Sequence, residues 1–154
     1  MIGLSQRDLG IVASQIVEET KPHVNLSLQI SKEEYRRRWK TVQEAMEKKD
    51  YDLLYVCGSE LDRSDAAWLA GVFDPMIERY GVIVPSKGTP IVLAGSEGGH
   101  VIEESAEKSG AEIALLTEFQ ISDEEYRWAR FVSLDHVLSR IGVKGTVKVA
   151  IASS

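Results

Sequence analysis

The residues most suggestive of chemistry follow a glycine pair at positions 98 and 99 of this 154-residue chain. His100 and Glu104 are four residues apart and would share one face of a helix, where an imidazole and a carboxylate can bind a divalent metal. The spacing is not that of the HExxH zinc motif. His23 and His136 are far from His100 in the sequence and form no known metal-ligand motif with it. An acidic helix start, favoured by the helix dipole, accounts for the same residues without a metal.

Other local signals of catalysis are weak. The glycines match neither GxGxxG nor GxxxxGK[ST], so a nucleotide site is not indicated. The only cysteine, Cys57, lies in an apolar run and is expected to behave as a small hydrophobic residue. No serine stands in a GxSxG elbow. Whether the chain takes part in an enzyme is therefore undecided at this level, and nothing local forms an active site.

Composition narrows the classes of partner. Hydrophobic residues make up 44% of the chain, and 18 Lys and Arg against 24 Asp and Glu give a net charge of −6. This balance disfavours nucleic acid and anionic membrane as partners. A single cysteine cannot form an intrachain disulfide, which fits a reducing compartment. No apolar run reaches the length of a membrane span, and residues 1–8 lack a signal-peptide pattern. We expect a cytoplasmic protein.

The basic run and the tryptophans have structural interpretations. Residues 36–40 hold three arginines and a lysine, which point in different directions on a helix and can pair with Glu33, Glu34 and Glu44. The three tryptophans are expected to be core or interface anchors rather than a base-stacking platform; they are Trp39, Trp68 and Trp128.

Apolar periodicity predicts alternating helices and strands. Ser31 with Glu34 forms a capping-box pattern that opens the second helix. Gly71 and Gly110 are placed to end two others. The predicted helices are residues 5–19, 32–49, 65–70, 99–109 and 133–141, and the predicted strands are 52–57, 81–84, 91–94, 112–116 and 147–151. The strand at 52–57 is expected to be buried on both faces of its sheet. Two strands joined by a loop with two prolines suggest a hairpin within a single mixed β-sheet with helices on both faces, an α/β fold. Residues 1–30 form an N-terminal helix and connecting segment, and residues 31–154 form the α/β domain.

Four stretches in a fixed order carry a resemblance to a known family. These are residues 35–56, with Tyr, Arg and Met in a helix before an apolar strand; DAAWLAG at 65–71; RYGVIVP at 79–85 with GTPIV at 88–92; and AGSEGG at 94–99. Together they resemble the N-terminal domain of the pita-bread metallopeptidases, which include Xaa-Pro aminopeptidase, prolidase and creatinase. The resemblance covers about residues 31–151 and implies the same mixed-sheet α/β fold.

The resemblance also implies that the chemistry lies elsewhere. The family's two-metal site uses two Asp, one His and two Glu of a C-terminal domain, where Mn, Co or Zn would be expected. No cofactor is expected in this segment. The chain then resembles a non-catalytic domain of a peptidase or related amide hydrolase that acts on a peptide or small amide substrate. Such a domain would contribute to a homodimer and to substrate selection at the neighbouring subunit's active site.

One loop bears on substrate choice. Where creatinase has FGRKYG, this chain has Met76, Ile77, Glu78, Arg79 and Tyr80 before Gly81. Met76, Glu78 and Arg79 thus become the candidate substrate-binding residues. Glu78 stands where creatinase has an arginine that meets the substrate carboxylate, and two carboxylates at close range repel. We therefore predict a substrate other than creatine. Arg79 could supply the positive group instead, or it could be a surface arginine paired with an acidic neighbour.

Two alternatives remain open. The chain could be a stand-alone α/β binding or scaffold module with no catalytic partner, or a small metal-binding enzyme centred on His100. The N-terminal helix, with its apolar stripe at Leu9, Val12, Ala13, Ile16 and Val17, favours a dimer modestly.

Overall fold

The structure is a computed structural model that describes residues 6–21, 25, 27–59, 62–72, 79–120 and 129–152, apart from the side chains of residues 6, 100 and 101. Its helices are α1 (Gln6–Thr20), α2 (Lys32–Lys48), α3 (Ser64–Ala70), α4 (Gly99–Ser109), α5 (Leu134–Arg140) and the 3₁₀ turn η1 (Thr117–Phe119). Its strands are β1 (Leu53–Gly58), β2 (Tyr80–Pro85), β3 (Ile91–Ala94), β4 (Glu112–Leu116), β5 (Phe131–Val132) and β6 (Val149–Ala152).

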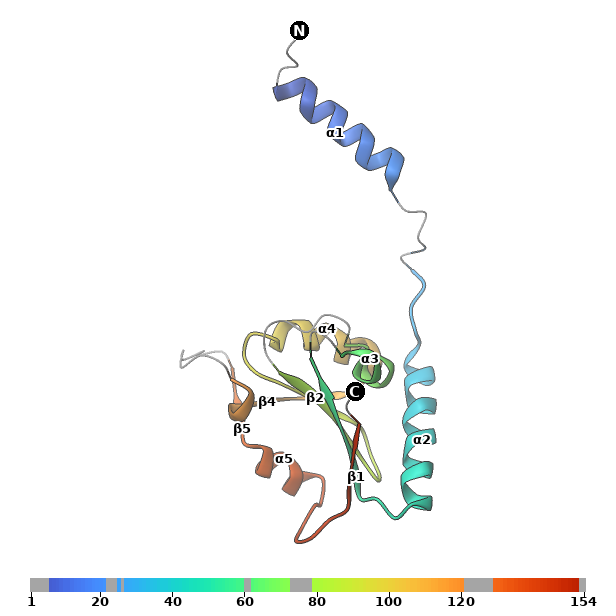
Figure 1. Ribbon diagram of the computed structural model, residues 1–154, viewed down its shortest axis with the longest axis vertical. Helices are drawn as coiled ribbons and strands as arrows, with labels where there is room; N and C mark the ends of the chain where they lie inside the picture. Colours follow the sequence, from blue (N-terminus) through green and yellow to red (C-terminus); the bar gives the residue numbers. More distant parts are fainter. Residues whose placement is uncertain are drawn as a thin grey trace.

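The six strands form one mixed sheet in the order β5-β4-β3-β2-β1-β6 (Figure 1). Strand β2 runs antiparallel to both of its neighbours, β1 and β3, whereas the pairs β3–β4, β4–β5 and β1–β6 are parallel. The predicted hairpin is thus β2–β3, and β2 is the one strand that runs against the others in the described sheet. This arrangement confirms the mixed α/β fold.

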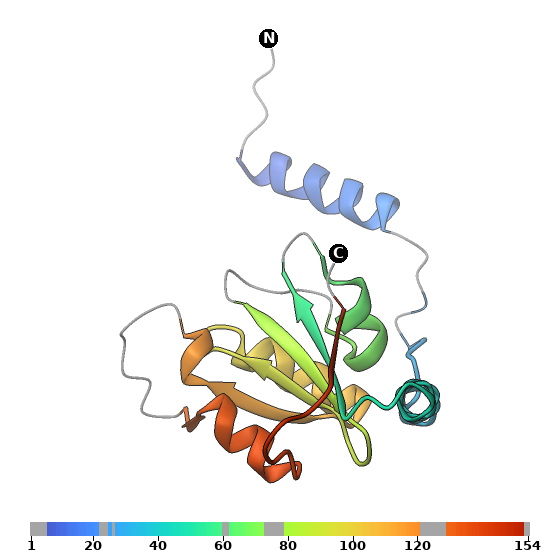
Figure 2. The same cartoon turned by 60° about the horizontal axis from the view of Figure 1, so that its bottom comes forward.

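Helices cover the two faces of the sheet unequally. One core cluster joins α2, α3 and α4 to the side chains of Val56, Val82, Val84 and Val92. The other joins α5, through Val137, to the opposite side of β2, β3 and β4. Figures 1 and 2 show α5 across the sheet from α2. Helices on both faces were predicted, and they are present.

Local caps set the ends of the helices. The Ser31 hydroxyl accepts a hydrogen bond from the Glu34 N–H at 3.2 Å, which confirms the predicted N-cap of α2. The reciprocal half of the capping box is wrong, because the Glu34 carboxylate accepts hydrogen bonds from Arg37 and Arg38 instead. Gly71 and Gly110 follow α3 and α4 with φ of 74° and 83°, a left-handed conformation that favours glycine.

Strand β6 is held to the start of β1 by polar contacts. The Lys148 N–H donates to the Asp52 carboxylate at 2.8 Å, and the Asp52 N–H donates to the Lys148 carbonyl at 2.9 Å. The Lys148 ammonium also donates to Asp50 Oδ2 at 2.7 Å. These bonds set the parallel register in which Leu53 faces Val149 and Tyr55 faces Ile151.

The expectation that the first strand is buried on both faces is wrong at its carboxyl end. Cys57 is exposed, and Tyr55 is only half-buried. On the same side of the sheet, Val149 and Ile151 of β6 are 41% and 68% exposed. The physical reason is coverage: α5 has seven residues and packs mainly on β2, β3 and β4, and Tyr55 is the residue of β1 that packs partly against this cluster.

Helix α1 confirms the predicted N-terminal helix to within one residue at each end. It stands apart from the sheet (Figure 1), and its described side chains are exposed. In the apolar stripe, Leu9, Val12, Ile16 and Val17 are 41% to 66% exposed. The division into residues 1–30 and 31–154 stays a prediction. No helix in the described part of the chain is both long and apolar enough to cross a membrane.

Candidate functional site

Loops converge at one end of the sheet, which makes that end the first place to look for a site. Gly58 closes β1 and pairs with Tyr80, the first residue of β2, and Tyr80 pairs in turn with Ala94, the last residue of β3. The loops after β1 and β3 and the residue before β2 therefore meet at the same end. Ligands of open α/β sheets bind outside the carboxyl ends of their strands. This end is the candidate site.

Arg79, one of the three predicted substrate-binding residues, lies at this end. It is exposed and directly precedes β2. Burial and the adjacent Cys57 thiol raise the pKa of Tyr55, and the positive charge of Arg79 acts in the opposite direction on that pKa. The guanidinium is therefore close enough to Tyr55 to act on its charge. Met76 and Glu78 lie outside the described residues, so the structure brings only Arg79 of the three predicted residues to the site.

Tyr80 is a buried residue at this end of the sheet. Its side chain is 3% exposed, and its ring occupies the space that a Cβ at Gly58 would need. The Tyr80 hydroxyl is buried with no hydrogen-bond partner within the described part of the chain. Burial raises the pKa of Tyr80 to about 12, and the nearby Asp62 carboxylate adds to the rise. Tyr80 is therefore neutral at physiological pH, and its ring packs on Gly58.

An open cleft of about 670 Å³ adjoins the loop after β1. Its wall combines an aromatic surface with polar groups of both signs; the lining residues are Ile30, Arg38, Asp62, Arg63, Ser64, Ala67 and Trp68. The Ser64 hydroxyl donates to the Asp62 carboxylate at 3.4 Å, and the Asp62 N–H donates to the Ser59 hydroxyl at 3.1 Å. These contacts hold Ser59, Asp62 and Ser64 together at the edge of the cleft. Charges of both signs beside a ring can bind and orient a polar ligand.

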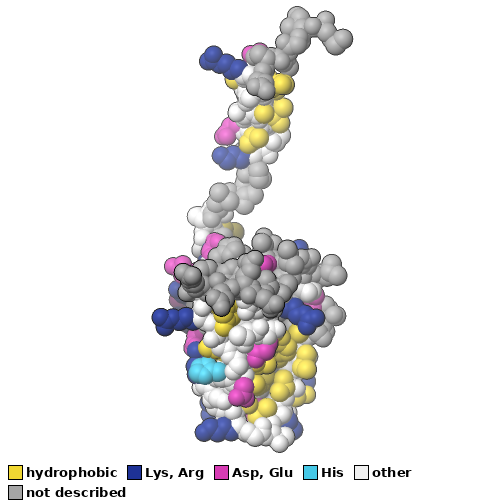
Figure 3. Space-filling model, turned by 90° about the vertical axis from the view of Figure 1, so that its left-hand side faces the viewer, with side chains coloured by type: hydrophobic (Ala, Val, Ile, Leu, Met, Phe, Trp, Pro, Cys, Tyr) yellow, Lys and Arg dark blue, Asp and Glu magenta, His cyan; other side chains and the backbone are white. Residues whose placement is uncertain are grey.

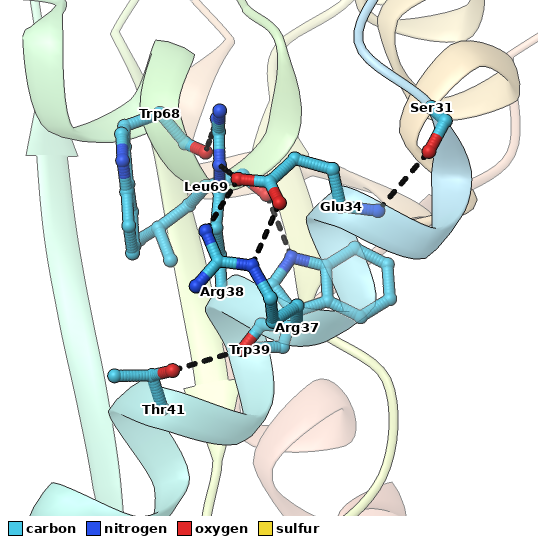
Figure 4. Close-up of polar contacts among 8 residues, drawn as sticks. All are labelled: Ser31, Glu34, Arg37, Arg38, Trp39, Thr41, Trp68 and Leu69. Carbon is cyan, nitrogen blue, oxygen red and sulfur yellow. Dashed lines mark hydrogen bonds and ion pairs between the residues drawn. The ribbon is translucent and has the colours of Figure 1, made fainter.

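Arg38 clamps α2 to α3 beside this cleft (Figure 4). Its Nε donates to Glu34 Oε1 at 2.9 Å, and its Nη1 donates to the Trp68 carbonyl at 2.8 Å. The guanidinium carbon lies 5.3 Å from the centre of the Tyr35 ring and 5.2 Å from that of Trp68, within the range of cation–π attraction.

Trp39 makes the parallel contact, because its indole N–H donates to the Leu69 carbonyl at 2.7 Å. The carbonyls in the last turn of a helix have no partner within that helix. Arg38 and Trp39 of α2 therefore satisfy two carbonyls of α3 and fix the wall of the cleft.

These contacts test the structural roles predicted for the basic run and for the tryptophans. The pairing of the run with its acidic neighbours is confirmed by ion pairs from Arg36 to Glu33, Arg37 and Arg38 to Glu34, and Lys40 to Glu44. Trp39 is a core anchor, as predicted, whereas Trp68 is 43% exposed and presents its ring to the cleft. Trp128 lies outside the described residues.

The sequence pattern did not predict that the Arg38 side chain points inward. Its side chain is 13% exposed, against 65% for Arg36 and 69% for Arg37. The available signal was its position between Tyr35 and Trp39 on the apolar face of the helix.

A metal site gains no support from the described residues. Among them, no group of three or more His, Cys, Asp or Glu side chains could hold an ion. Glu104, the proposed partner of His100, forms an ion pair with Lys108, which lowers the pKa of its carboxyl group. The side chain of His100 and the whole of His23 lie outside the description. His136 is an exposed residue of α5 and is far along the chain from Gly98 and Gly99.

The clamp predicts an acid sensitivity. Hydrogen bonds from Arg37 and Arg38 lower the pKa of Glu34 from 4.5 to about 2. A carboxylate with a lowered pKa in the folded state stabilises that state above its ordinary pKa, and the contribution is lost as the pH falls through the lowered value. We expect the melting temperature of the native chain to exceed that of Glu34→Gln near neutral pH, and this gap to close between about pH 4.5 and about pH 2.

Thermal melts across that range measure this gap. Glu44→Gln is the matched control, because its carboxylate pairs with Lys40 of the same helix at 3.8 Å and its side chain is 55% exposed. A gap between native chain and Glu34→Gln that does not change with pH would contradict the prediction.

Comparison with solved structures places this fold among peptidases. The chain matches a prolidase from Thermococcus sibiricus (TM-score 0.51, 22% identity), covering 78% of this chain and 29% of that one. It matches a dipeptidase from Pyrococcus horikoshii (TM-score 0.52, 14% identity), covering 76% of this chain and 28% of that one. It also matches the N-terminal domain of Xaa-Pro dipeptidase from Lactobacillus brevis (TM-score 0.50, 16% identity), covering 74% and 75% of the two chains. No family model and no curated protein matches the sequence.

These matches define the class of fold. The chain has the mixed-sheet α/β fold found in prolidases and in the N-terminal domain of an Xaa-Pro dipeptidase, as the resemblance predicted. It spans less than a third of the length of the prolidase and of the dipeptidase that it matches. At these identities the likeness concerns the fold alone.

Proposed function

We propose that this chain is the non-catalytic N-terminal domain of a metal-dependent Xaa-Pro peptidase or related amide hydrolase. The observation that carries the proposal is the fold itself, shared with a prolidase and with an N-terminal domain of an Xaa-Pro dipeptidase. The order of four sequence motifs along residues 31–151 agrees with it. A shared fold does not by itself imply a shared activity, so the role is a proposal that experiment must test.

In this proposal the metal ions belong to a second domain. The described residues of this chain do not fit a metal centre, because they hold no cluster of three ligating side chains. The expected Mn, Co or Zn would therefore be bound by the catalytic domain. The contribution of this chain is to bind and orient a substrate, and to take part in a homodimer.

Substrate selection would act through the end of the sheet that holds Arg79. This exposed guanidinium can donate paired hydrogen bonds to a carboxylate of a peptide or small amide substrate at the neighbouring subunit's active site. Met76 and Glu78 precede it in the same loop, and the negative charge of Glu78 would reject a substrate carboxylate placed beside it. The proposed substrate class, an Xaa-Pro peptide or related amide, comes from the fold shared with a prolidase and an Xaa-Pro dipeptidase. Glu78, in the place of the creatinase arginine, argues against creatine.

The first experiment concerns the reading frame. The complete reading frame of the gene is expressed, loaded with Mn, Co or Zn, and assayed on Xaa-Pro dipeptides and longer Xaa-Pro peptides beside the 154-residue chain. Hydrolysis by the longer product alone would support the proposal. A reading frame that encodes no metal-binding domain would favour the stand-alone binding module.

Within the active longer product, Arg79→Ala is expected to lower kcat/KM by about tenfold to a hundredfold. Loss of a charge-assisted hydrogen bond costs about 1.5–3 kcal/mol. The melting temperature should not change, because Arg79 is exposed. Arg36→Ala is the control, since Arg36 is an exposed arginine of α2 paired with Glu33. Unchanged kinetics of Arg79→Ala would remove Arg79 from the site.

A further inference from the structure

On one face of the sheet, the start of β1 is covered, with Leu53 3% exposed, whereas the carboxyl end of β1 and strand β6 carry exposed side chains. On this side α5 packs against Ile83, Ile91, Leu93 and neighbouring residues of β2, β3 and β4. The adjoining pair β1–β6 carries exposed apolar side chains on the same side, and Figure 3 shows hydrophobic side chains gathered on this face of the molecule. Parallel strands in α/β proteins are usually covered on both faces. The exposed part of β1 and β6 is therefore an exception to the architecture.

The register defines the members of this surface. Leu53 pairs with Val149 and Tyr55 with Ile151, so these side chains share one side of the sheet, while Val56 and Ala152 contact the core on the other side. Cys57 is two residues after Tyr55 and shares its side. We define the β1–β6 face as Tyr55, Cys57, Val149 and Ile151.

The β1–β6 face is a continuous surface rather than scattered residues. The Tyr55 ring lies across Gly81 of β2, where a Cβ would come within 2.8 Å of its Cε2. The exposed Cys57 follows Tyr55 on the same side of the strand. Val149 and Ile151 extend the surface to the outer edge of the sheet, where Ile151 is 68% exposed. Contiguous exposed apolar surface of this kind marks a place where another protein surface packs.

We propose that the β1–β6 face is the docking surface for the catalytic domain of the same polypeptide. This inference rests on the proposed function and adds the surface through which the two domains meet. The prolidase and the dipeptidase that share the fold have more than two thirds of their chains outside the matched region. β6 is the last and outermost strand described, so a domain joined after it would be tethered beside this face. A short tether gives an effective concentration in the millimolar range.

Helix α1 is a weaker occupant than a following domain. The α2 helix packs on the opposite side of the sheet, in the cluster with Val56 and Val82. α1 precedes α2 and is therefore tethered to that opposite side. A second copy of the chain would lack the tether and would have to bind from solution. These two occupants become outcomes of the experiment.

Cys57 provides the readout, because it is the only cysteine in the chain and is exposed on this face. Its alkylation by N-ethylmaleimide is followed by mass spectrometry of its peptide, in the 154-residue chain and in the product of the complete reading frame. We expect alkylation to be slower by about tenfold or more in the longer product. A docking free energy of about 1.4 kcal/mol would keep Cys57 covered about ten times as often as it is exposed.

Ile151→Asp in the longer product should restore the fast rate, because a carboxylate in an apolar interface opposes docking. Val17→Asp on α1 is the matched control, since Val17 is 66% exposed against 68% for Ile151, and it should leave alkylation slow. Circular dichroism of each variant confirms that it is folded.

The contrary outcomes are distinct from one another. Equal alkylation rates in the 154-residue chain and in a longer product that hydrolyses Xaa-Pro peptides would overturn the docking surface and leave the proposed function standing. If alkylation of the 154-residue chain is slow and becomes faster on dilution, a second copy of the chain covers the face. If it is slow at every concentration, α1 covers the face. A reading frame without a second domain would overturn both the proposed function and the docking surface.

Discussion

Gly58→Ala should destabilise the chain by about 3 kcal/mol, the upper end of the usual cost of overpacking a core. A Cβ at this position would overlap the ring of Tyr80, which is 3% exposed and packs in the core cluster of α2, α3 and α4. The ring cannot move aside without leaving that core. For a domain with a total stability of about 5–15 kcal/mol, this is a large fraction.

Urea denaturation followed by tryptophan fluorescence measures the effect. Gly10→Ala is the matched control, because nothing lies within 4 Å of a Cβ at Gly10 in the exposed α1 helix. The midpoint of the sheet domain should be unchanged by that substitution. If Gly58→Ala also leaves the midpoint where it was, the close packing of Tyr80 on Gly58 is not what holds this end of the sheet.

Trp39→Ala should cost about 3–5 kcal/mol, as expected for truncation of a buried tryptophan. The side chain is 6% exposed, fills the space between α2 and α3, and donates to the Leu69 carbonyl at 2.7 Å. Trp39→Phe keeps most of the apolar packing and loses the hydrogen bond. Its expected cost is therefore smaller than that of the alanine variant.

The comparison of the two variants separates packing from hydrogen bonding at the clamp between α2 and α3. The loss of stability is again measured by urea denaturation, here followed by circular dichroism because a tryptophan is removed. Equal costs for Trp39→Phe and Trp39→Ala would show that the hydrogen bond to Leu69, rather than apolar burial, dominates.

The longer elements follow from sequence pattern because their signals are local. The apolar spacing of Tyr35, Trp39, Val42 and Met46 predicts the inward face of α2. Val42 is partly buried there and the other three are buried. Gly71 and Gly110 end their helices where predicted, because glycine adopts the left-handed conformation without steric cost. The last strand begins two residues later than predicted and ends one residue later.

Short elements cannot be predicted from sequence pattern in the same way. β5 has two residues and η1 has three, too few to show any periodicity. β5 exists because Phe131 and Val132 pair with Leu115 and Leu116 of β4, a contact across a distance in sequence that pattern alone cannot reveal.

Part of the site could be predicted from the sequence. The motif order placed Arg79 at the start of the hairpin, and the structure puts it at the end of the sheet where β1 and β3 finish. Arg38 could not be separated from its neighbours in the same way. Its inward direction depends on the rings of Tyr35 and Trp68 and on a carbonyl of α3, and Trp68 lies 30 positions farther along the chain.

The sequence by itself determined the order and type of the main elements, the absence of an intrachain disulfide, and the class of fold. Those properties depend on composition, on spacing within single segments and on motif order. The tertiary structure alone decided which side of β1 is covered, and so exposed Cys57. It also decided that Trp68 faces a cleft while Trp39 enters the core. Burial depends on which distant segments pack together, and an apolar strand has the same local pattern whether its second face meets a helix, a second domain or solvent.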